Sequence, residues 1–363
     1  MGTVREPAKD SAPLLPVEIV LHPSWWHHHE GICFDEDFFF HPLKRVETER
    51  RMEQVLYDRW GRYGLGADRG DERPLVGAVH LAAGFLVSEM LGCRVEYRPD
   101  RPPEVHCARS DSLTVDVEQG FSSEAYRRFD ALTQSLRTRY GYLAGDVNWS
   151  GILNVALDLR GEDLFLDFAD RGAEVARFLT DISTVLDRFT SGIQRETGSS
   201  SISVNRTVGH VHRSLFLHSE CSHTMISTGD YERYLLPFDV AWSRSRRPFG
   251  IHYCGTDPHR YAESFQKVPH LDFLDVGWGG DVELLRRYLP TTFLNLRLSP
   301  VEIPQQTPEE IRATIVGLVR ASGGLRLTGL CCINVDHSVR DDQIAAIFEA
   351  AESLRDEYRH AHP

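Results

Sequence analysis

The stretch Phe249-Gly250-Ile251-His252-Tyr253-Cys254-Gly255 is the starting point for interpreting the chain. Large apolar side chains at every second position, 249, 251 and 253, give it the two-residue period of a β-strand. His252 and Cys254 should then point to the same face, roughly 7 Å apart along the strand. Imidazole and thiolate are both preferred zinc ligands, so the pair predicts half of a zinc site. The alternative for so short a pattern is a pair of ordinary core residues.

The other half of the predicted site is expected from a distant strand. The best candidate is Leu330-Cys331-Cys332-Ile333, with 76 residues between Cys254 and Cys331. Adjacent strand residues face opposite ways, so only Cys331 is expected to coordinate, while Cys332 packs against outer helices. Glu220 is the candidate for the fourth position, and its alternative is a solvated loop carboxylate. The predicted metal ligands are therefore His252, Cys254, Cys331 and Glu220.

Composition narrows the class of protein. The chain has 363 residues, enough for one large or two small domains, and its 40 basic and 53 acidic residues give a net charge of −13. This charge argues against nucleic-acid partners and anionic membrane surfaces. No apolar run is long enough to span a bilayer, and Met1–Pro16 lacks the apolar core of a signal peptide. Seven cysteines without a framework spacing fit a reducing cytoplasm, so we expect a cytoplasmic protein.

Strand and helix patterns alternate along the second half of the chain. The expected strands are Leu215–Leu217, Phe249–Cys254, Leu271–Val276, Thr292–Leu296 and Leu325–Ile333. Each precedes a helical pattern, and Thr307-Pro308-Glu309-Glu310 has the form of a capped helix start. Five such units, with two or three more before residue 200 that include Val76–Val79 and Leu143–Asn148, predict a (β/α)8 TIM barrel. An open doubly wound sheet is the alternative, but no glycine-rich dinucleotide fingerprint follows an early strand.

The predicted domain organisation is simple. Residues 1–16 are expected to be a disordered lead, and residues 17–363 a single barrel domain. Within that domain, about residues 17–75 are expected to form an N-terminal extension or lid. This region includes the aromatic and histidine-rich segment Pro23–Glu30, which is either a packed surface segment or a lid over a pocket.

Barrel enzymes carry their sites at the carboxyl ends of the strands. Four expected strand ends here carry polar or sulfur side chains. Besides the metal ligands, His218 follows the first of these strands, Asp275 lies in the third, and Trp278 stands just beyond it. Glu220, His218 and Asp275 are the candidate catalytic residues.

The sequence also resembles a known superfamily. The runs Asn148–Leu157 and Gly161–Asp167 look like the early barrel of the uroporphyrinogen decarboxylase superfamily. Ser227–Pro237 resembles that superfamily's "LSPE-aromatic-xx-F-xx-P" segment, and Thr307–Ile311 resembles its late "TPEE" helix start. The resemblance covers roughly residues 140 to 355 and implies a (β/α)8 barrel.

Within this superfamily, the cysteine and histidine spacing is similar to the zinc motif of the corrinoid-linked methyltransferases, which include the methylcobalamin:coenzyme M enzymes. The resemblance implies zinc ligation by His252, Cys254 and Cys331, and less securely by Glu220. The arginine-rich "RQAGRY" segment of the true decarboxylases is missing, which counts against porphyrinogen decarboxylation. Arg297 stands near the position where the coenzyme M enzymes have Asn, which leaves the substrate open.

The resemblance implies a zinc-dependent transfer of a methyl or other alkyl group to a small thiol. A zinc-bound thiol is deprotonated at neutral pH and remains a nucleophile. The simplest methyl donor is methylcobalamin carried on a small corrinoid protein. Substrate contacts are expected from Asn148, Trp278, Arg297 and His28. The alternatives are a metal-independent decarboxylase or lyase of the same fold and a non-catalytic protein with a structural zinc.

Overall fold

The computed structural model describes residues 14–74, 84–144, 149–198 and 215–362. Within these residues, six strands form one parallel sheet in the order β1-β8-β7-β6-β5-β4. The strands are β1 (Val17–Leu21), β4 (Phe216–Ser219), β5 (Phe249–His252), β6 (Phe273–Val276), β7 (Phe293–Arg297) and β8 (Thr328–Val335).

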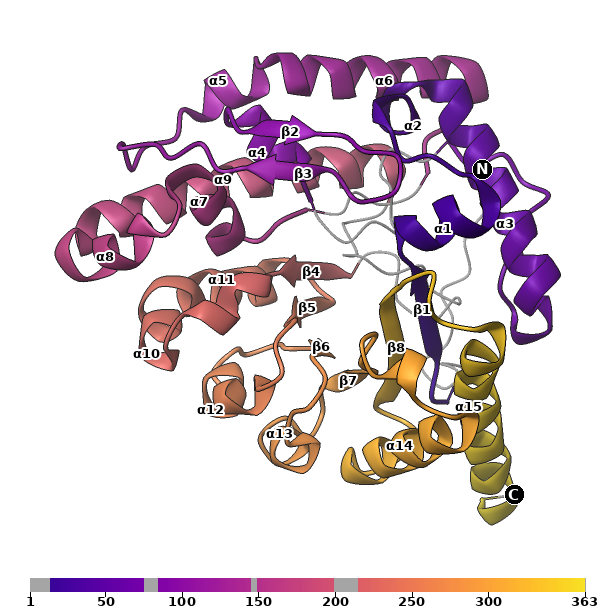
Figure 1. Ribbon diagram of the computed structural model, residues 1–363. Helices are drawn as coiled ribbons and strands as arrows, with labels where there is room; N and C mark the ends of the chain where they lie inside the picture. The colour runs from indigo at the N-terminus through magenta and orange to yellow at the C-terminus, as the bar shows by residue number, and fades with distance from the viewer. Residues whose placement is uncertain (1–13, 75–83, 145–148, 199–214, 363) are drawn as a thin grey trace.

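The sheet is wound in one direction. From β4 to β8 each strand lies beside the next one in the chain, and a helix follows each of them. These helices are α11 (Leu236–Ser245), α12 (Ala262–Phe265), α13 (Val282–Tyr288), α14 (Pro308–Ala321) and α15 (Asp341–Ala361). They lie on the outer side of a curled sheet (Figure 1). A doubly wound sheet would reverse its strand order at a switch point, which the described strands do not do.

The described part of the sheet is therefore a half-barrel with β1 and β4 at its edges. The predicted strand Val76–Val79 and most of the predicted strand Leu143–Asn148 lie outside the described residues. The predicted alternation of strands and helices is confirmed from β4 onwards.

Helices from the first half of the chain form a separate layer beside the sheet (Figure 1). They are α1 (Pro23–Glu30), α2 (Glu36–Phe40), α3 (Pro42–Trp60), α4 (Leu86–Met90), α5 (Val117–Phe121), α6 (Glu124–Tyr140), α7 (Ile152–Arg160), α8 (Asp163–Asp170) and α9 (Gly172–Thr197). A small antiparallel pair, β2 (Arg94–Glu96) and β3 (Glu104–His106), lies among them. Among the described helices, none has the length and apolar character required to cross a membrane.

Local sequence rules account for several element boundaries. Thr307 caps α14 through a reciprocal capping box with Glu310, as its sequence predicts. The short helix α10 (Thr228–Asp230) runs into a π-helical segment, Tyr231–Leu235, which leads directly into α11. Single π-helical turns are rare and occur frequently at functional sites.

The two faces of the sheet carry different side chains. On the outer face, residues such as Ile251, Leu274 and Cys332 join the main hydrophobic core with the surrounding helices. On the inner face, a small cluster of Leu215, Leu217 and Phe273 fills the end where the strands begin. Alternation along the strands therefore leaves polar side chains at the carboxyl end of the inner face.

Candidate metal and thiol site

Three side chains bring possible metal donors together at the carboxyl end of the inner face. One donor atom from each of Cys221, His252 and Cys254 lies within 4.8 Å of the other two. The Cys254 Sγ is at the centre, 2.7 Å from His252 Nε2 and 2.9 Å from Cys221 Sγ. His252 ends β5, Cys254 follows two residues later, and Cys221 comes from the segment after β4. Two sulfurs and one imidazole nitrogen form a donor set that suits zinc.

Asp275 on β6 orients the imidazole. Its Oδ2 lies 2.5 Å from His252 Nδ1, and the two residues are register partners on neighbouring strands. Both side chains are buried. A carboxylate on Nδ1 fixes the ring so that Nε2 faces the sulfur of Cys254, which is the arrangement found behind metal-binding histidines.

Arg297 at the end of β7 places a buried positive charge next to Asp275, His252 and Cys254. Its Nη2 donates to Asp275 Oδ2 at 3.0 Å and lies 3.1 Å from His252 Nδ1, while Nη1 lies 3.4 Å from Cys254 Sγ. Arg297 is only 3% exposed to solvent, so water screens the charge of its guanidinium little.

These contacts shift the proton affinities in the site. Hydrogen bonding from Cys221 lowers the pKa of Cys254 despite burial, and His252 and Arg297 lower it further. The same hydrogen bond raises the pKa of Cys221. Burial alone would lower the pKa of His252, but the charges of Cys254 and Asp275 raise it to about 9. The arrangement favours a thiolate on Cys254 with protonated neighbours.

Two predicted ligands lie outside this group. Both carboxylate oxygens of Glu220 accept backbone N–H groups at the start of α7, and Glu220 is not among the three clustered residues. Cys331 is not among them either, and its Sγ contacts Asp275 Oδ1 at 3.4 Å. Cys332 points into the outer core, so the two adjacent cysteines do face opposite ways. Coordination of a metal by Cys331 or Glu220 stays a prediction.

The candidate catalytic residue His218 lies behind the sheet. Its Nδ1 is 2.7 Å from Asp239 Oδ1 on α11, and its Nε2 is 3.5 Å from Glu220 Oε2. Burial would lower the pKa of His218, but the carboxylates of Asp239 and Glu220 raise it to about 9. His218 Nε2 also accepts the backbone N–H of Ile152 at 3.3 Å, so this residue belongs to the contacts around Glu220 and the start of α7 rather than to the three donors.

The predicted substrate contacts are spread over several elements. Arg297 is in the site, and Trp278 is partly buried just after β6. His28 is exposed on α1, with its ring 5.1 Å from that of His337 beyond β8. Asn148 lies outside the described residues.

Cys221 is the site residue that sequence reasoning missed. It lies in a 3-10 turn, Cys221–Met225, two residues after the end of β4. The strand period that identifies His252 and Cys254 gives no orientation for a residue in such a turn. The only sequence cue was its place after a predicted strand that ends at the carboxyl edge of the barrel.

A close approach of two backbones supports the loop that follows Cys254. A Cβ atom on Gly277, just beyond β6, would lie 1.8 Å from the carbonyl oxygen of Gly255. Only glycine fits there without moving the segment that follows Cys254.

We therefore expect Gly277→Ala to lower the free energy of unfolding by about 3 kcal/mol or more, since backbone atoms cannot move aside as a flexible side chain can. Gly317→Ala is the matched control, because Gly317 is exposed on α14 and its Cβ would meet nothing within 4 Å. That control should gain about 1 kcal/mol. Urea unfolding of both variants checks the pair, and equal effects would contradict the proposed close approach.

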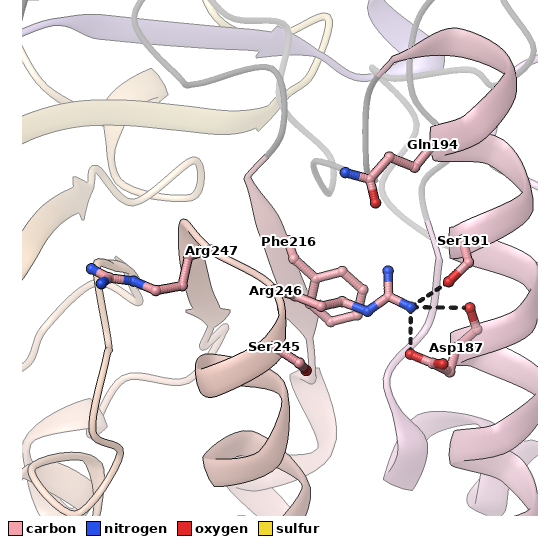
Figure 2. Close-up of a pocket in the computed structure, with 7 residues that line it drawn as sticks. All are labelled: Asp187, Ser191, Gln194, Phe216, Ser245, Arg246 and Arg247. Carbon is pink, nitrogen blue, oxygen red and sulfur yellow. Dashed lines mark hydrogen bonds and ion pairs between the residues drawn. The ribbon is translucent and has the colours of Figure 1, made fainter.

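A separate cavity of about 360 Å³ lies at the opposite end of the sheet, where β4 begins. Figure 2 shows Arg246 crossing it from the end of α11 to Asp187 and Ser191 on α9. Arg246 also covers the ring of Phe216 at 4.9 Å, and Arg247 pairs with Asp272. Both arginines are thus already paired, and the described residues that line the cavity include no cysteine or histidine. We assign it a structural role.

Comparison with known proteins adds evidence on the fold. No protein-family model and no curated protein matches the chain. Among solved structures, a methyltransferase from Methanosarcina mazei is similar with a TM-score of 0.63 and 13% sequence identity, over 96% of both chains. A B12-independent methionine synthase from Shewanella sp. W3-18-1, solved in complex with selenomethionine, gives a TM-score of 0.49 at 10% identity, over 96% of this chain and 99% of that one. The chain therefore shares its fold with the Methanosarcina mazei methyltransferase.

Proposed function

We propose that this protein is a zinc-dependent methyltransferase whose acceptor is a small thiol. The observation that carries the proposal is the group formed by Cys221, His252 and Cys254 at the carboxyl end of a parallel half-barrel. The fold shared with a methyltransferase supports the reaction class. We also propose that the chain is a member of the uroporphyrinogen decarboxylase superfamily, in its corrinoid-linked methyltransferase branch.

The residues present fit a zinc ion. Cys221, His252 and Cys254 would hold it, with Asp275 fixing the imidazole, and Cys331 is the sequence-based alternative to Cys221 as the second sulfur ligand. When bound, zinc would lower the pKa of an added thiol so that it reacts as a thiolate at neutral pH.

The chain's own residues would prepare the acceptor site electrostatically. Arg297 holds a permanent positive charge 3.4 Å from Cys254 Sγ, and Asp275 holds that guanidinium in place at 3.0 Å. A positive charge in a buried site favours an acceptor that enters with a negative group. Trp278, His28 and Asn148 remain proposed substrate contacts around this centre.

We also propose that the half-barrel of the described residues is part of a complete (β/α)8 barrel. The methyl donor is proposed to be methylcobalamin, free or on a corrinoid protein.

The proposal is tested by incubating the purified protein with methylcobalamin and a panel of small thiols, including homocysteine and mercaptoethanesulfonate. We expect loss of the methylcobalamin absorbance and a methylated thiol detected by mass spectrometry. Cys107→Ser should leave the rate unchanged, since Cys107 is an exposed thiol after β3. Absence of methylated product with every thiol would contradict the proposal.

A metal-independent decarboxylase or lyase is the second candidate. The buried guanidinium of Arg297 favours it, because such a group can hold a substrate carboxylate. This function needs no metal, so full activity toward a carboxylic acid after removal of all metal by chelation would favour it over methyl transfer.

A further inference from the structure

Two polar side chains fasten the Cys221 segment to the start of α7. Glu220 Oε2 accepts the backbone N–H of Leu153 at 2.7 Å, and Oε1 accepts that of Asn154 at 3.1 Å. The side chain of Asn154, on α7, forms hydrogen bonds with residues on both sides of Cys221. Its Nδ2 donates to the carbonyl oxygen of Ser219 at 3.0 Å, and its Oδ1 accepts from the Ser222 backbone N–H at 3.0 Å and hydroxyl at 2.6 Å.

The packing around Glu220 matches this role. The residue is fully buried, so its charge needs compensation from fixed groups. The N–H groups and dipole of the nine-residue helix α7 supply part of it. Gly151 makes room for the carboxylate, since a Cβ there would lie 2.5 Å from Glu220 Oε2.

A second set of contacts supports Glu220 from behind. His218 Nε2 lies 3.5 Å from Glu220 Oε2, and the other ring nitrogen contacts Asp239. Tyr231, in the π-helical segment, donates its hydroxyl to the second oxygen of Asp239 at 2.7 Å. The Cys221 segment is thus tied to both α7 and α11.

We propose that Glu220 and Asn154 are positioning residues that hold the Cys221 thiol beside Cys254. They flank Cys221 through contacts at residues 219, 220 and 222, and Cys221 Sγ lies 2.9 Å from Cys254 Sγ. The role of Glu220 in the site is this attachment to α7. As it concerns a metal site, the inference rests on the proposed function.

The first test compares zinc affinities by competition with a chromogenic chelator. Glu220→Gln puts an N–H₂ group against the backbone N–H donors of α7, and Asn154→Ala removes the three contacts of its side chain. Each should weaken zinc binding about 10- to 100-fold, as loss of supporting contacts does elsewhere. Ser88→Ala is the matched control, because it removes a 2.6 Å hydrogen bond to Asp158, one turn further along α7 than Asn154, and leaves the contacts at residues 219 to 222 in place. The control should bind zinc as the wild type does.

The second test needs no metal. Oxidised glutathione is added to the full chain in the presence of a chelator. The Cys254 thiolate attacks the disulfide and releases one reduced glutathione. The Cys221 thiolate then attacks the Cys254 sulfur, releasing the second and closing a Cys221–Cys254 disulfide. Peptide mapping should find this bond in the wild type. In Asn154→Ala, the ratio of oxidised to reduced glutathione needed to form the bond should rise at least about tenfold. Cys221→Ser should stop at the mixed disulfide.

The two tests separate the inference from the proposed function. A wild type that binds no zinc but closes the disulfide more readily than Asn154→Ala would overturn the metal site and retain the positioning role. Zinc affinity and disulfide formation that are unchanged in both Glu220→Gln and Asn154→Ala would overturn the positioning role. If Glu220→Gln does not fold, Asn154→Ala, whose side chain is only partly buried, decides the question.

Discussion

Replacing Cys254 with serine should remove the metal and the transfer activity together. Cys254 Sγ is the common centre of the site, at 2.9 Å from Cys221 Sγ, 2.7 Å from His252 Nε2 and 3.4 Å from Arg297 Nη1. Serine is a poor zinc ligand at neutral pH compared with a thiolate. We expect zinc affinity and turnover to fall more than about 100-fold, beyond the range seen when only supporting contacts are lost. Metal analysis and the methylcobalamin assay on the same sample measure both.

Cys332→Ala is the control for this variant. Cys332 is fully buried among the outer core residues, so its loss should lower stability slightly and leave metal content unchanged. A Cys254→Ser protein that retained zinc with wild-type affinity would contradict the proposed ligand set.

Replacing Asp275 with alanine should be among the most destabilising single changes in the chain. Asp275 is completely buried and contacts Arg297, His252 and Cys331. Its removal leaves a buried guanidinium without its carboxylate, which typically costs about 3–5 kcal/mol. Urea unfolding should show this loss. The double variant Asp275→Ala/Arg297→Met should lose less than the sum of the two single changes, because it leaves neither charge unpaired.

An exposed ion pair provides the comparison. Asp356 and Arg359 lie 2.8 Å apart on α15, with both side chains more than half exposed. Asp356→Ala should therefore cost less than about 1 kcal/mol. If Asp275→Ala lowers the free energy of unfolding by no more than this control does, the buried pair of Asp275 and Arg297 does not stabilise the fold as predicted.

The strand-and-helix order and one half of the site could be predicted from the sequence. The alternation after residue 215 gives β4 to β8 with their helices, because local periodicity decides each element. The same period places His252 and Cys254 together, as found. It also separates Cys331 from Cys332, which point to the inner and outer faces.

The remaining parts of the site depend on contacts between distant segments. Glu220 has the chemistry of a zinc ligand, but its oxygens meet the start of α7, about 66 residues away in sequence. No local sequence pattern predicts that contact. Without it, the orientation of Cys221 toward Cys254 cannot be predicted. Arg297 presents the same difficulty. Its strand period gives its face, but its partner Asp275 becomes apparent only when β6 and β7 are side by side.

Zinc K-edge X-ray absorption can identify the ligands of the proposed metal site, since it counts sulfur neighbours at about 2.3 Å from the metal. The group of Cys221, His252 and Cys254 predicts one zinc per chain with two sulfur neighbours, and three after the acceptor thiol is added. Cys221→Ala should lower the initial count to one. A count that falls in Cys331→Ala instead, and not in Cys221→Ala, would assign the second sulfur to Cys331. If protein purified without chelator contains no zinc or other divalent metal, the proposed metal site is wrong.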